Sequence, residues 1–197
     1  MGSTVSVRDG LLAILTLGPA YGLQLHAELA ARSPHRGTVN PGQIYATLER
    51  LGRAGLIESG GRTHDGLPLH RLTPEGRSTA DRWLRTPLAG GVPEWSEMLD
   101  QILVGATVDP VATERLTRDY RVRWSAELDA AREDAVDSGR ETTIAGWASD
   151  ARAAHARAAL EWLAAVSDRL TAGTTARPLS TVKPRRGRRP HDEPGAS

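Results

Sequence analysis

The chain has 197 residues, of which 39% are hydrophobic and 25% charged, as is ordinary for a globular protein with a core of its own. It has no cysteine, which excludes disulfides and cysteine-ligated zinc, and no phenylalanine, so aliphatic side chains and five tryptophans must fill the core. The apolar run Leu11–Leu15 is too short to span a bilayer and no signal sequence is evident, so we expect a cytoplasmic protein without membrane segments.

The charge is distributed unevenly along the chain, although the net charge is only +1. Residues 1–89 carry a net charge of +3, residues 90–176 carry −6 and residues 177–197 carry +4. A basic N-terminal part followed by an acidic part is consistent with a polyanion, such as nucleic acid, binding to the first part. Ordinary scatter of charge would give the same small excess, so nucleic-acid binding has to be judged from the residue patterns.

The chain opens with two predicted helices. The first spans about residues 7–17 and ends at Gly18-Pro19, because proline resists the continuation of a helix. The second spans about residues 21–31, where leucines lie one helical turn apart, and a loop at residues 33–37 comes after it.

The third predicted helix has the clearest boundary signals in the chain. Asn40 suits the N-cap and Pro41 suits the first turn. Gln43, three residues after Asn40, resembles the second half of a capping box, in which two side chains bind unpaired backbone N–H groups. Gly55 suits the end of the helix. The apolar stripe that defines the buried face consists of Ile44, Leu48 and Leu51.

A β-hairpin and a fourth helix are predicted next. Short strand-like runs at residues 56–59 and 69–72 flank a glycine-rich stretch, in which Asp65-Gly66 is typical of a hairpin turn. Thr73-Pro74 then suits the start of a helix that ends near residue 85.

The remainder is predicted to be helical, with a disordered end. After a linker rich in glycine and proline, three helical patterns extend to about residue 170. From residue 172 onward apolar residues almost vanish, which predicts disorder. The basic run at residues 183–190 either adds nonspecific phosphate contacts or only keeps the chain soluble. The predicted parts are a winged-helix domain at residues 1–89, a helical domain at residues 90–171 and a basic tail at residues 172–197.

Helix, helix, capped helix, hairpin and helix within about 85 residues is the order of a winged helix-turn-helix. The predicted fold is therefore mainly α: a winged helix with a small β-hairpin, followed by an all-helical C-terminal region. In this fold the third helix enters the major groove of DNA, where glutamine pairs with adenine and arginine with guanine or a phosphate. The N–H groups around Gly42 also favour a phosphate. The residues expected to face outward are Gln43, Ala46, Thr47 and Arg50. Every amphipathic helix has a polar outer face, so spacing alone leaves DNA binding open.

Several ordered blocks resemble the PadR family of bacterial transcriptional regulators, in its branch with a longer C-terminal part. They cover about residues 7–85 and comprise Leu11–Leu15, Gly18–Leu25, Pro41–Leu51, Ala54–Ile57 and Leu72–Gly76. The resemblance implies a homodimer, usually a repressor, that binds a pseudo-palindromic operator in double-stranded DNA. It also implies dimerisation through the C-terminal helices and, in many members, a response to a small aromatic effector.

The candidate residues form three sets, for DNA binding, effector binding and dimerisation. The resemblance implies that Tyr45 contacts the DNA backbone and that the wing around Arg62–His64 reaches a neighbouring groove. The second wing strand departs from the family pattern at Leu69-His70, which leaves Arg71 as its main positive charge. The DNA-binding set is Asn40, Gly42, Gln43, Tyr45, Ala46, Thr47, Arg50, Arg62, His64 and Arg71. An effector site, for which core filling by tryptophan is the alternative, would use Trp95, Met98 and Trp124. The dimerisation set is Leu99, Ile102, Leu103, Trp162 and Val166.

No pattern predicts catalysis, a cofactor or a metal. The six histidines lack the i, i+3 or i+4 spacing of metal ligands, and phosphate-binding and nucleophile motifs are missing from the sequence. The acidic residues Glu94, Glu97 and Asp100 are interpreted as a solvated helix face. The sequence thus predicts a DNA-binding regulator and not an enzyme. The alternative is a winged-helix module whose third helix binds a protein, and salt-dependent binding to DNA distinguishes the two.

Overall fold

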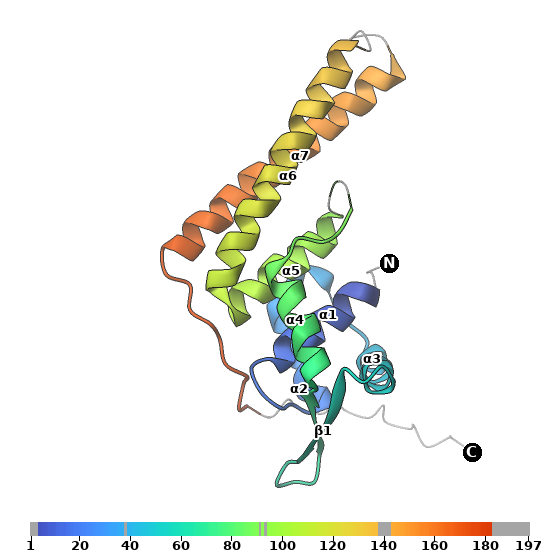
Figure 1. Cartoon of the computed structure of the whole chain (residues 1–197), viewed down its shortest axis with the longest axis vertical. Helices are drawn as coiled ribbons and strands as arrows, with labels where there is room; N and C mark the ends of the chain where they lie inside the picture. Colours follow the sequence, from blue (N-terminus) through green and yellow to red (C-terminus); the bar gives the residue numbers. More distant parts are fainter. Residues whose placement is uncertain (1–3, 38, 91, 93, 138–142, 183–197) are drawn as a thin grey trace, which may run out of the picture.

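The computed structural model describes residues 4–37, 39–90, 92, 94–137 and 143–182. Figure 1 shows a helical body with a β-hairpin at one end and two long helices, α6 and α7, extending from the other. The elements in chain order are α1 (Thr4–Leu15), α2 (Gly22–Arg32), the 3-10 helix η1 (Pro34–Arg36), α3 (Pro41–Arg53), β1 (Ile57–Arg62), β2 (Pro68–Leu72), α4 (Pro74–Arg85), α5 (Trp95–Val108), α6 (Pro110–Asp137) and α7 (Ile144–Thr171).

The first four helices and the hairpin pack around one core. α1 lies at its centre, because the run Leu11–Leu15 is apolar on all sides and every side chain in it is buried. α3 buries the predicted stripe of Ile44, Leu48 and Leu51 against this core. α4 begins where predicted, since Thr73 Oγ1 accepts a hydrogen bond from the Gly76 N–H at 3.0 Å. Local patterns in the sequence therefore place the first four helices correctly.

The two strands form the predicted antiparallel hairpin, and it is longer than expected. The pairing reaches Arg62 and Pro68, beyond the runs 56–59 and 69–72 that the sequence indicates. Gly66 lies in the connecting turn with a φ of 77°, a backbone conformation that glycine adopts at little cost. Glycine-rich strand ends have no alternating apolar pattern, which is why the sequence underestimates the length of the strands.

α5 takes part in two cores. Val104 packs into the core of the winged helix, whereas Ile102 packs into a second core formed with α6 and α7. Gln101 joins the same elements through buried hydrogen bonds: it accepts one from the Tyr120 hydroxyl and donates one to the Thr86 carbonyl oxygen at 2.8 Å. Burial raises the pKa of Tyr120 to about 12, so its hydroxyl keeps its proton and remains a donor at neutral pH.

α6 and α7 pair as an antiparallel helical hairpin of two 28-residue helices. α6 fills the space between them with the large side chains of Leu116, Tyr120, Trp124 and Leu128. α7 contributes small side chains that allow close approach, those of Ala153, Ala156 and Ala159. α7 begins after Thr143, whose Oγ1 accepts a hydrogen bond from the Gly146 N–H at 3.1 Å. The predicted helix break at Ser138-Gly139 lies outside the described residues.

After α7 the chain turns back along the body and reaches α2 (Figure 1). We call residues 177–182 the strap. The Arg177 N–H donates to the Thr107 carbonyl oxygen of α5 at 2.8 Å, and Leu179 packs against the core of the winged helix. The disorder expected from residue 172 onward is therefore not observed as far as residue 182, because polar contacts and one leucine hold this stretch in place. Residues 183–197 lie outside the described residues.

The mainly helical fold class, with a winged helix and a helical C-terminal part, is confirmed. Within the described ranges, none of the helices has the length and apolar character needed to cross a membrane.

Candidate nucleic-acid interface

The outer face of α3 exposes most of the side chains that the sequence places there. Tyr45 is 54% exposed, Ala46 and Arg50 are exposed, and Gln43 is half-buried. Thr47 differs: it is 1% exposed, and its Oγ1 donates to the Gln43 carbonyl oxygen at 2.7 Å. The prediction that Thr47 faces outward is wrong, because position 47 lies on the same side of the helix as the apolar stripe.

The N-terminus of α3 is closed by its own cap. The Asn40 side-chain oxygen accepts a hydrogen bond from the Gly42 N–H at 2.8 Å, and the Gln43 N–H donates to the Asn40 carbonyl oxygen at 2.9 Å. The predicted N-cap at Asn40 is confirmed. The expected open N–H at Gly42 is not, because a phosphate would have to displace the Asn40 side chain.

Arg50 lies along the exposed face of α3. Its Nη2 donates to Thr47 Oγ1 at 3.0 Å and its Nε to the Ala46 carbonyl oxygen at 3.3 Å. These contacts direct the guanidinium toward the N-terminal half of the helix, the part that enters the groove in winged-helix proteins. The buried Thr47 thus positions Arg50.

Tyr45 owes its position to a glycine of the preceding helix. A Cβ atom at Gly22, the first residue of α2, would lie 2.5 Å from Cε1 of the Tyr45 ring. The ring therefore lies against bare backbone at the start of α2 while more than half of the side chain stays exposed. The only sequence signal for this arrangement was the family resemblance of the two blocks that contain Gly22 and Tyr45.

The wing flanks α3, with a groove of about 450 Å³ between them that Tyr45 and His70 both line. At the tip His64 is exposed, and the Arg62 Nη1 donates to the Gly66 carbonyl oxygen at 2.7 Å, so this guanidinium folds over the turn. The backbone of His70 pairs with that of Ala20 in an isolated antiparallel β-bridge, which anchors the wing on the body. Burial lowers the pKa of His70, so its imidazole is neutral at pH 7 and supplies no charge to a phosphate.

The interface carries little net positive charge. α3 and the wing, residues 41–72, contain four arginines and three carboxylates. Arg53 pairs with Glu49 at 2.6 Å, and Arg71 pairs with Glu58 at 3.0 Å. Arg71, the main charge expected on the second wing strand, is thus partly neutralised by its neighbour across the hairpin.

An ionic contact joins α5 to the segment that precedes α3. Asp100 is 1% exposed and accepts hydrogen bonds from Arg36, one of them from Nε at 2.6 Å. Nε2 of His35 lies 3.2 Å from the same carboxylate. The interpretation of Asp100 as part of a solvated face is wrong, because η1 covers this side of α5. The sequence gives no signal for a contact between residues so far apart.

The candidate effector residues lie in an aromatic cluster between α5, α6 and α7. Met98 and Trp124 are buried, and the indole N–H of Trp124 donates to Met98 Sδ at 3.1 Å. Trp95 is half-buried, with its ring centroid 5.5 Å from that of Trp162 and 5.9 Å from that of His155. Of the three candidates, Trp95 is the one with surface that a ligand can reach.

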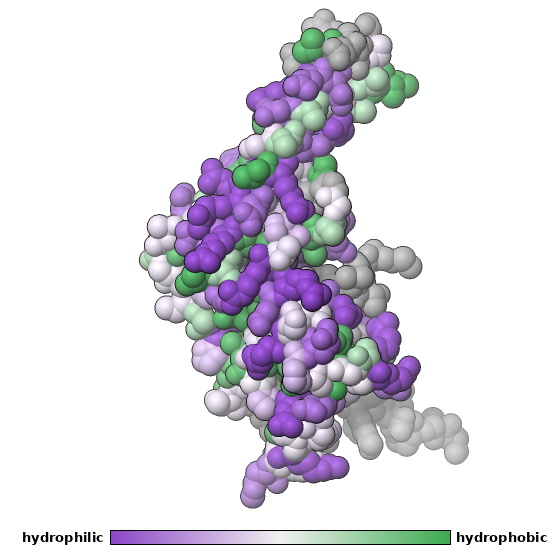
Figure 2. Space-filling model, in the orientation of Figure 1, coloured by the Kyte–Doolittle hydropathy of each residue, from purple (hydrophilic) through white to green (hydrophobic). Residues whose placement is uncertain are grey.

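The candidate dimerisation residues divide in the same way. Ile102 and Val166 lie in the core formed by α5, α6 and α7, whereas Leu99, Leu103 and Trp162 are half-buried. Sequence reasoning assigned no interface role to the most exposed apolar side chains of the helical hairpin, which are those of Val111, Val122, Val136, Ile144 and Trp147. Figure 2 shows hydrophobic residues at the distal end of this hairpin.

The fold and this surface define a winged helix-turn-helix protein with a helical C-terminal extension. Residues 11–82 match the family described as "Transcriptional regulator PadR-like family". The predicted resemblance to this family is confirmed for this part of the chain. No curated protein matches the chain.

Solved structures of PadR-like regulators are similar to the chain over most of their length. The regulator BC1756 of Bacillus cereus has 22% identity over 84% of this chain and 98% of its own, with a TM-score of 0.35. The PadR of Bacillus subtilis in complex with p-coumaric acid has 16% identity over 84% and 99%, with a TM-score of 0.37. The same protein in complex with operator DNA has 16% identity over 83% and 98%, with a TM-score of 0.36.

Proposed function

We propose that the chain is a sequence-specific DNA-binding transcriptional regulator of the cytoplasm, with α3 as its recognition helix. The observation that carries the proposal is the exposed face of α3, where Arg50 and Tyr45 are held by Thr47 and Gly22, within the segment that matches a family of transcriptional regulators. The half-buried Gln43 adds a side chain that pairs with adenine, and the wing flanks the helix as in DNA-binding winged helices.

The test is a gel shift with the DNA upstream of the protein's own gene, with competitor DNA and a series of salt concentrations. Arg50→Ala is expected to weaken binding to the shifted DNA by about 1–3 kcal/mol, because a base or phosphate loses its guanidinium. Arg115→Ala, which removes an exposed arginine from α6, is the control and should leave binding unchanged. Equal binding isotherms for the wild type and Arg50→Ala would show that Arg50 does not contribute to DNA binding.

The alternative function is a winged-helix module that binds a protein with α3. It predicts weak DNA binding that Arg50→Ala leaves unaltered. Specific retardation that declines steeply with salt contradicts this alternative, because release of counterions from phosphates is what makes DNA binding sensitive to salt.

The regulator would act as a homodimer that binds a pseudo-palindromic operator, with the two α3 helices about 34 Å apart. Ile144 and Trp147, 80% and 65% exposed on α7, are the side chains we assign to the contact between subunits. Ile144→Asp is expected to shift the protein from dimer to monomer in sedimentation velocity, because the contact would bury an unpaired carboxylate. Ser125→Asp, at an exposed polar position of α6, should remain a dimer. A dimer that persists in Ile144→Asp would place the interface elsewhere.

We further assign repression, relieved by a small aromatic effector that binds at the Trp95 edge of the aromatic cluster. A flat ring there would extend the edge-to-face contacts that Trp95 already makes with Trp162 and His155. Titration of the full chain with aromatic carboxylic acids should change its tryptophan fluorescence and weaken the gel shift. A panel without either response would leave the tryptophans as core filling alone.

A further inference from the structure

We propose that the strap fixes the helical hairpin of α6 and α7 against the winged helix and couples the position of this hairpin to that of the recognition helix α3. The coupling to α3 rests on the proposed function, whereas the fixing of the hairpin does not. Three observations support the proposal: how the strap is bound, which helices meet where it binds, and what its two ends are attached to.

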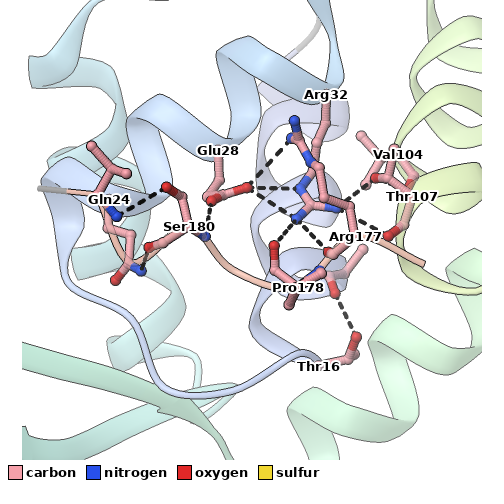
Figure 3. A network of polar contacts seen from close by, with 11 residues as sticks. Thr16, Gln24, Glu28, Arg32, Val104, Thr107, Arg177, Pro178 and Ser180 are labelled. Carbon is pink, nitrogen blue, oxygen red and sulfur yellow. Dashed lines mark hydrogen bonds and ion pairs between the residues drawn. The ribbon is translucent and has the colours of Figure 1, made fainter. Parts of the chain in front are cut away.

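The strap is bound to α2 through a buried ion pair. Arg32 is completely buried, and its Nη2 donates to the carbonyl oxygens of Arg177 at 2.9 Å and Pro178 at 3.3 Å (Figure 3). Glu28 is 4% exposed and accepts from the Ser180 N–H at 2.6 Å and from Arg32 Nε at 3.0 Å. Buried charges need such partners, so the pair on α2 is stable in this position only while the strap is bound.

The strap binds where α2 meets α5. Arg32 also donates from Nη1 to Thr107, to Oγ1 at 2.6 Å and to the carbonyl oxygen at 3.1 Å. Thr107 lies in the last turn of α5, and its carbonyl oxygen accepts a second hydrogen bond from the Arg177 N–H at 2.8 Å. One guanidinium therefore joins α2, the end of α5 and the strap. Because α5 packs into both cores, this is also the junction between the winged helix and the helical hairpin.

The strap connects the end of α7 to the part of α2 that lies against α3. α7 ends at Thr171, and residues 172–176 lead directly to the strap. At the other end Gln24, in the first turn of α2, donates from Nε2 to the Ser180 carbonyl oxygen at 2.9 Å. Gly22, the first residue of α2, lies against the ring of Tyr45. A displacement of α7 is therefore transmitted through the strap to the end of α2 that supports this side chain.

The strap has one apolar contact with the body. Leu179 is half-buried and packs against the core of the winged helix, whereas the other side chains of the strap are exposed. So few contacts hold the strap that a single substitution in it should release it and leave both cores folded.

Distances between spin labels test whether the strap fixes the hairpin. The chain has no cysteine, so introduced cysteines are the only labelling sites. Ser78→Cys on α4 and Ser125→Cys on α6 replace exposed serines, one on the winged helix and one on the hairpin. Double electron–electron resonance on the doubly labelled full chain, diluted with unlabelled chain, then records the distance within one subunit.

The label pair is measured in the otherwise unchanged chain and in three variants of the strap. Leu179→Asp removes the apolar contact, and Ser180→Pro removes the N–H group that Glu28 accepts. Thr181→Asp adds a carboxylate at an exposed strap position and is the matched control. Leu179→Asp and Ser180→Pro should broaden or shift the distance distribution, with helical content by circular dichroism unchanged, and the control should not. A distribution that stays the same in both would overturn the proposal.

The same variants without labels test the coupling to α3, in a gel shift with the DNA upstream of the protein's own gene. Leu179→Asp and Ser180→Pro should bind about tenfold more weakly than Thr181→Asp, because α3 is less well positioned. The dependence of binding on salt should be unchanged, since every positive charge is still present. Altered distances with unaltered DNA binding would overturn the coupling. Failure of the wild type to bind any DNA would overturn the proposed function and with it the coupling, and the label distances would still decide whether the strap fixes the hairpin.

Discussion

Replacing Trp124 by alanine is expected to lower the free energy of unfolding by about 3–5 kcal/mol. The indole is 1% exposed and fills the space between α6 and α7, where the surrounding helices cannot collapse onto a smaller side chain. The change also removes the N–H contact to Met98 Sδ and the edge contact to the His155 ring, whose centroid lies 5.0 Å away. Loss of both contacts adds to the cost of the cavity.

Urea unfolding followed by circular dichroism at 222 nm would measure this change, with Val122→Ala as the control on the same helix. Val122 is 71% exposed, so its truncation should cost less than about 0.5 kcal/mol. Similar midpoints for Trp124→Ala and the wild type would show that the helical hairpin does not depend on this core. A destabilised Val122→Ala would instead indicate that the control position is covered in solution.

Gly76→Ala is expected to destabilise the winged helix by about 3 kcal/mol or more. A Cβ atom at position 76 would lie 1.8 Å from the carbonyl oxygen of Leu56, an atom of the backbone that no rotamer change can move. The same oxygen accepts a hydrogen bond from the Thr73 N–H at 3.1 Å, so α4 and the start of the hairpin would have to separate. The close approach of two backbones is the reason for glycine here.

Gly52→Ala is the control, and it is expected to raise the free energy of unfolding and not to lower it. Gly52 lies inside α3, and a Cβ atom there would have open space around it. Alanine should stabilise the helix by about 0.5–1 kcal/mol, because glycine loses more backbone entropy on folding. Thermal unfolding of both variants tests the pair, and a midpoint of Gly76→Ala at or above that of the wild type would contradict the argument.

The parts of the interface that depend on local signals could be predicted, and those that depend on packing could not. Asn40 and Pro41 mark the start of α3 because a cap involves only neighbouring residues. The prediction that Thr47 is exposed was wrong because it relied on the polar residue type. The Thr47 hydroxyl donates a hydrogen bond to the Gln43 carbonyl oxygen, and with this bond made a small polar residue can occupy a buried position. A polar residue type therefore does not by itself show which face of a helix is exposed.

The order of the strap could not be predicted from the sequence for a different physical reason. Its composition has the low apolar content of disordered segments, and its stability comes from partners about 145 residues away, as between Arg32 and Arg177. Glu28 and Arg32 have the spacing of an ordinary surface ion pair along a helix. Only the three-dimensional structure reveals that the pair is buried. The contact between Arg36 and Asp100 could not be predicted for the same reason.

Because α5 contributes to two cores, any rotation of the helical hairpin relative to the winged helix would have to pass through the packing of this helix. The 28 residues of α6 make an arm of about 42 Å at 1.5 Å per residue. A rotation of about 5° at α5 would displace the far end of such an arm by about 4 Å, a distance comparable to the rise of one base pair. In the proposed homodimer, joined near the far ends of two such arms, small adjustments around Asp100 and Val104 would change the spacing of half-sites that the two α3 helices can bridge.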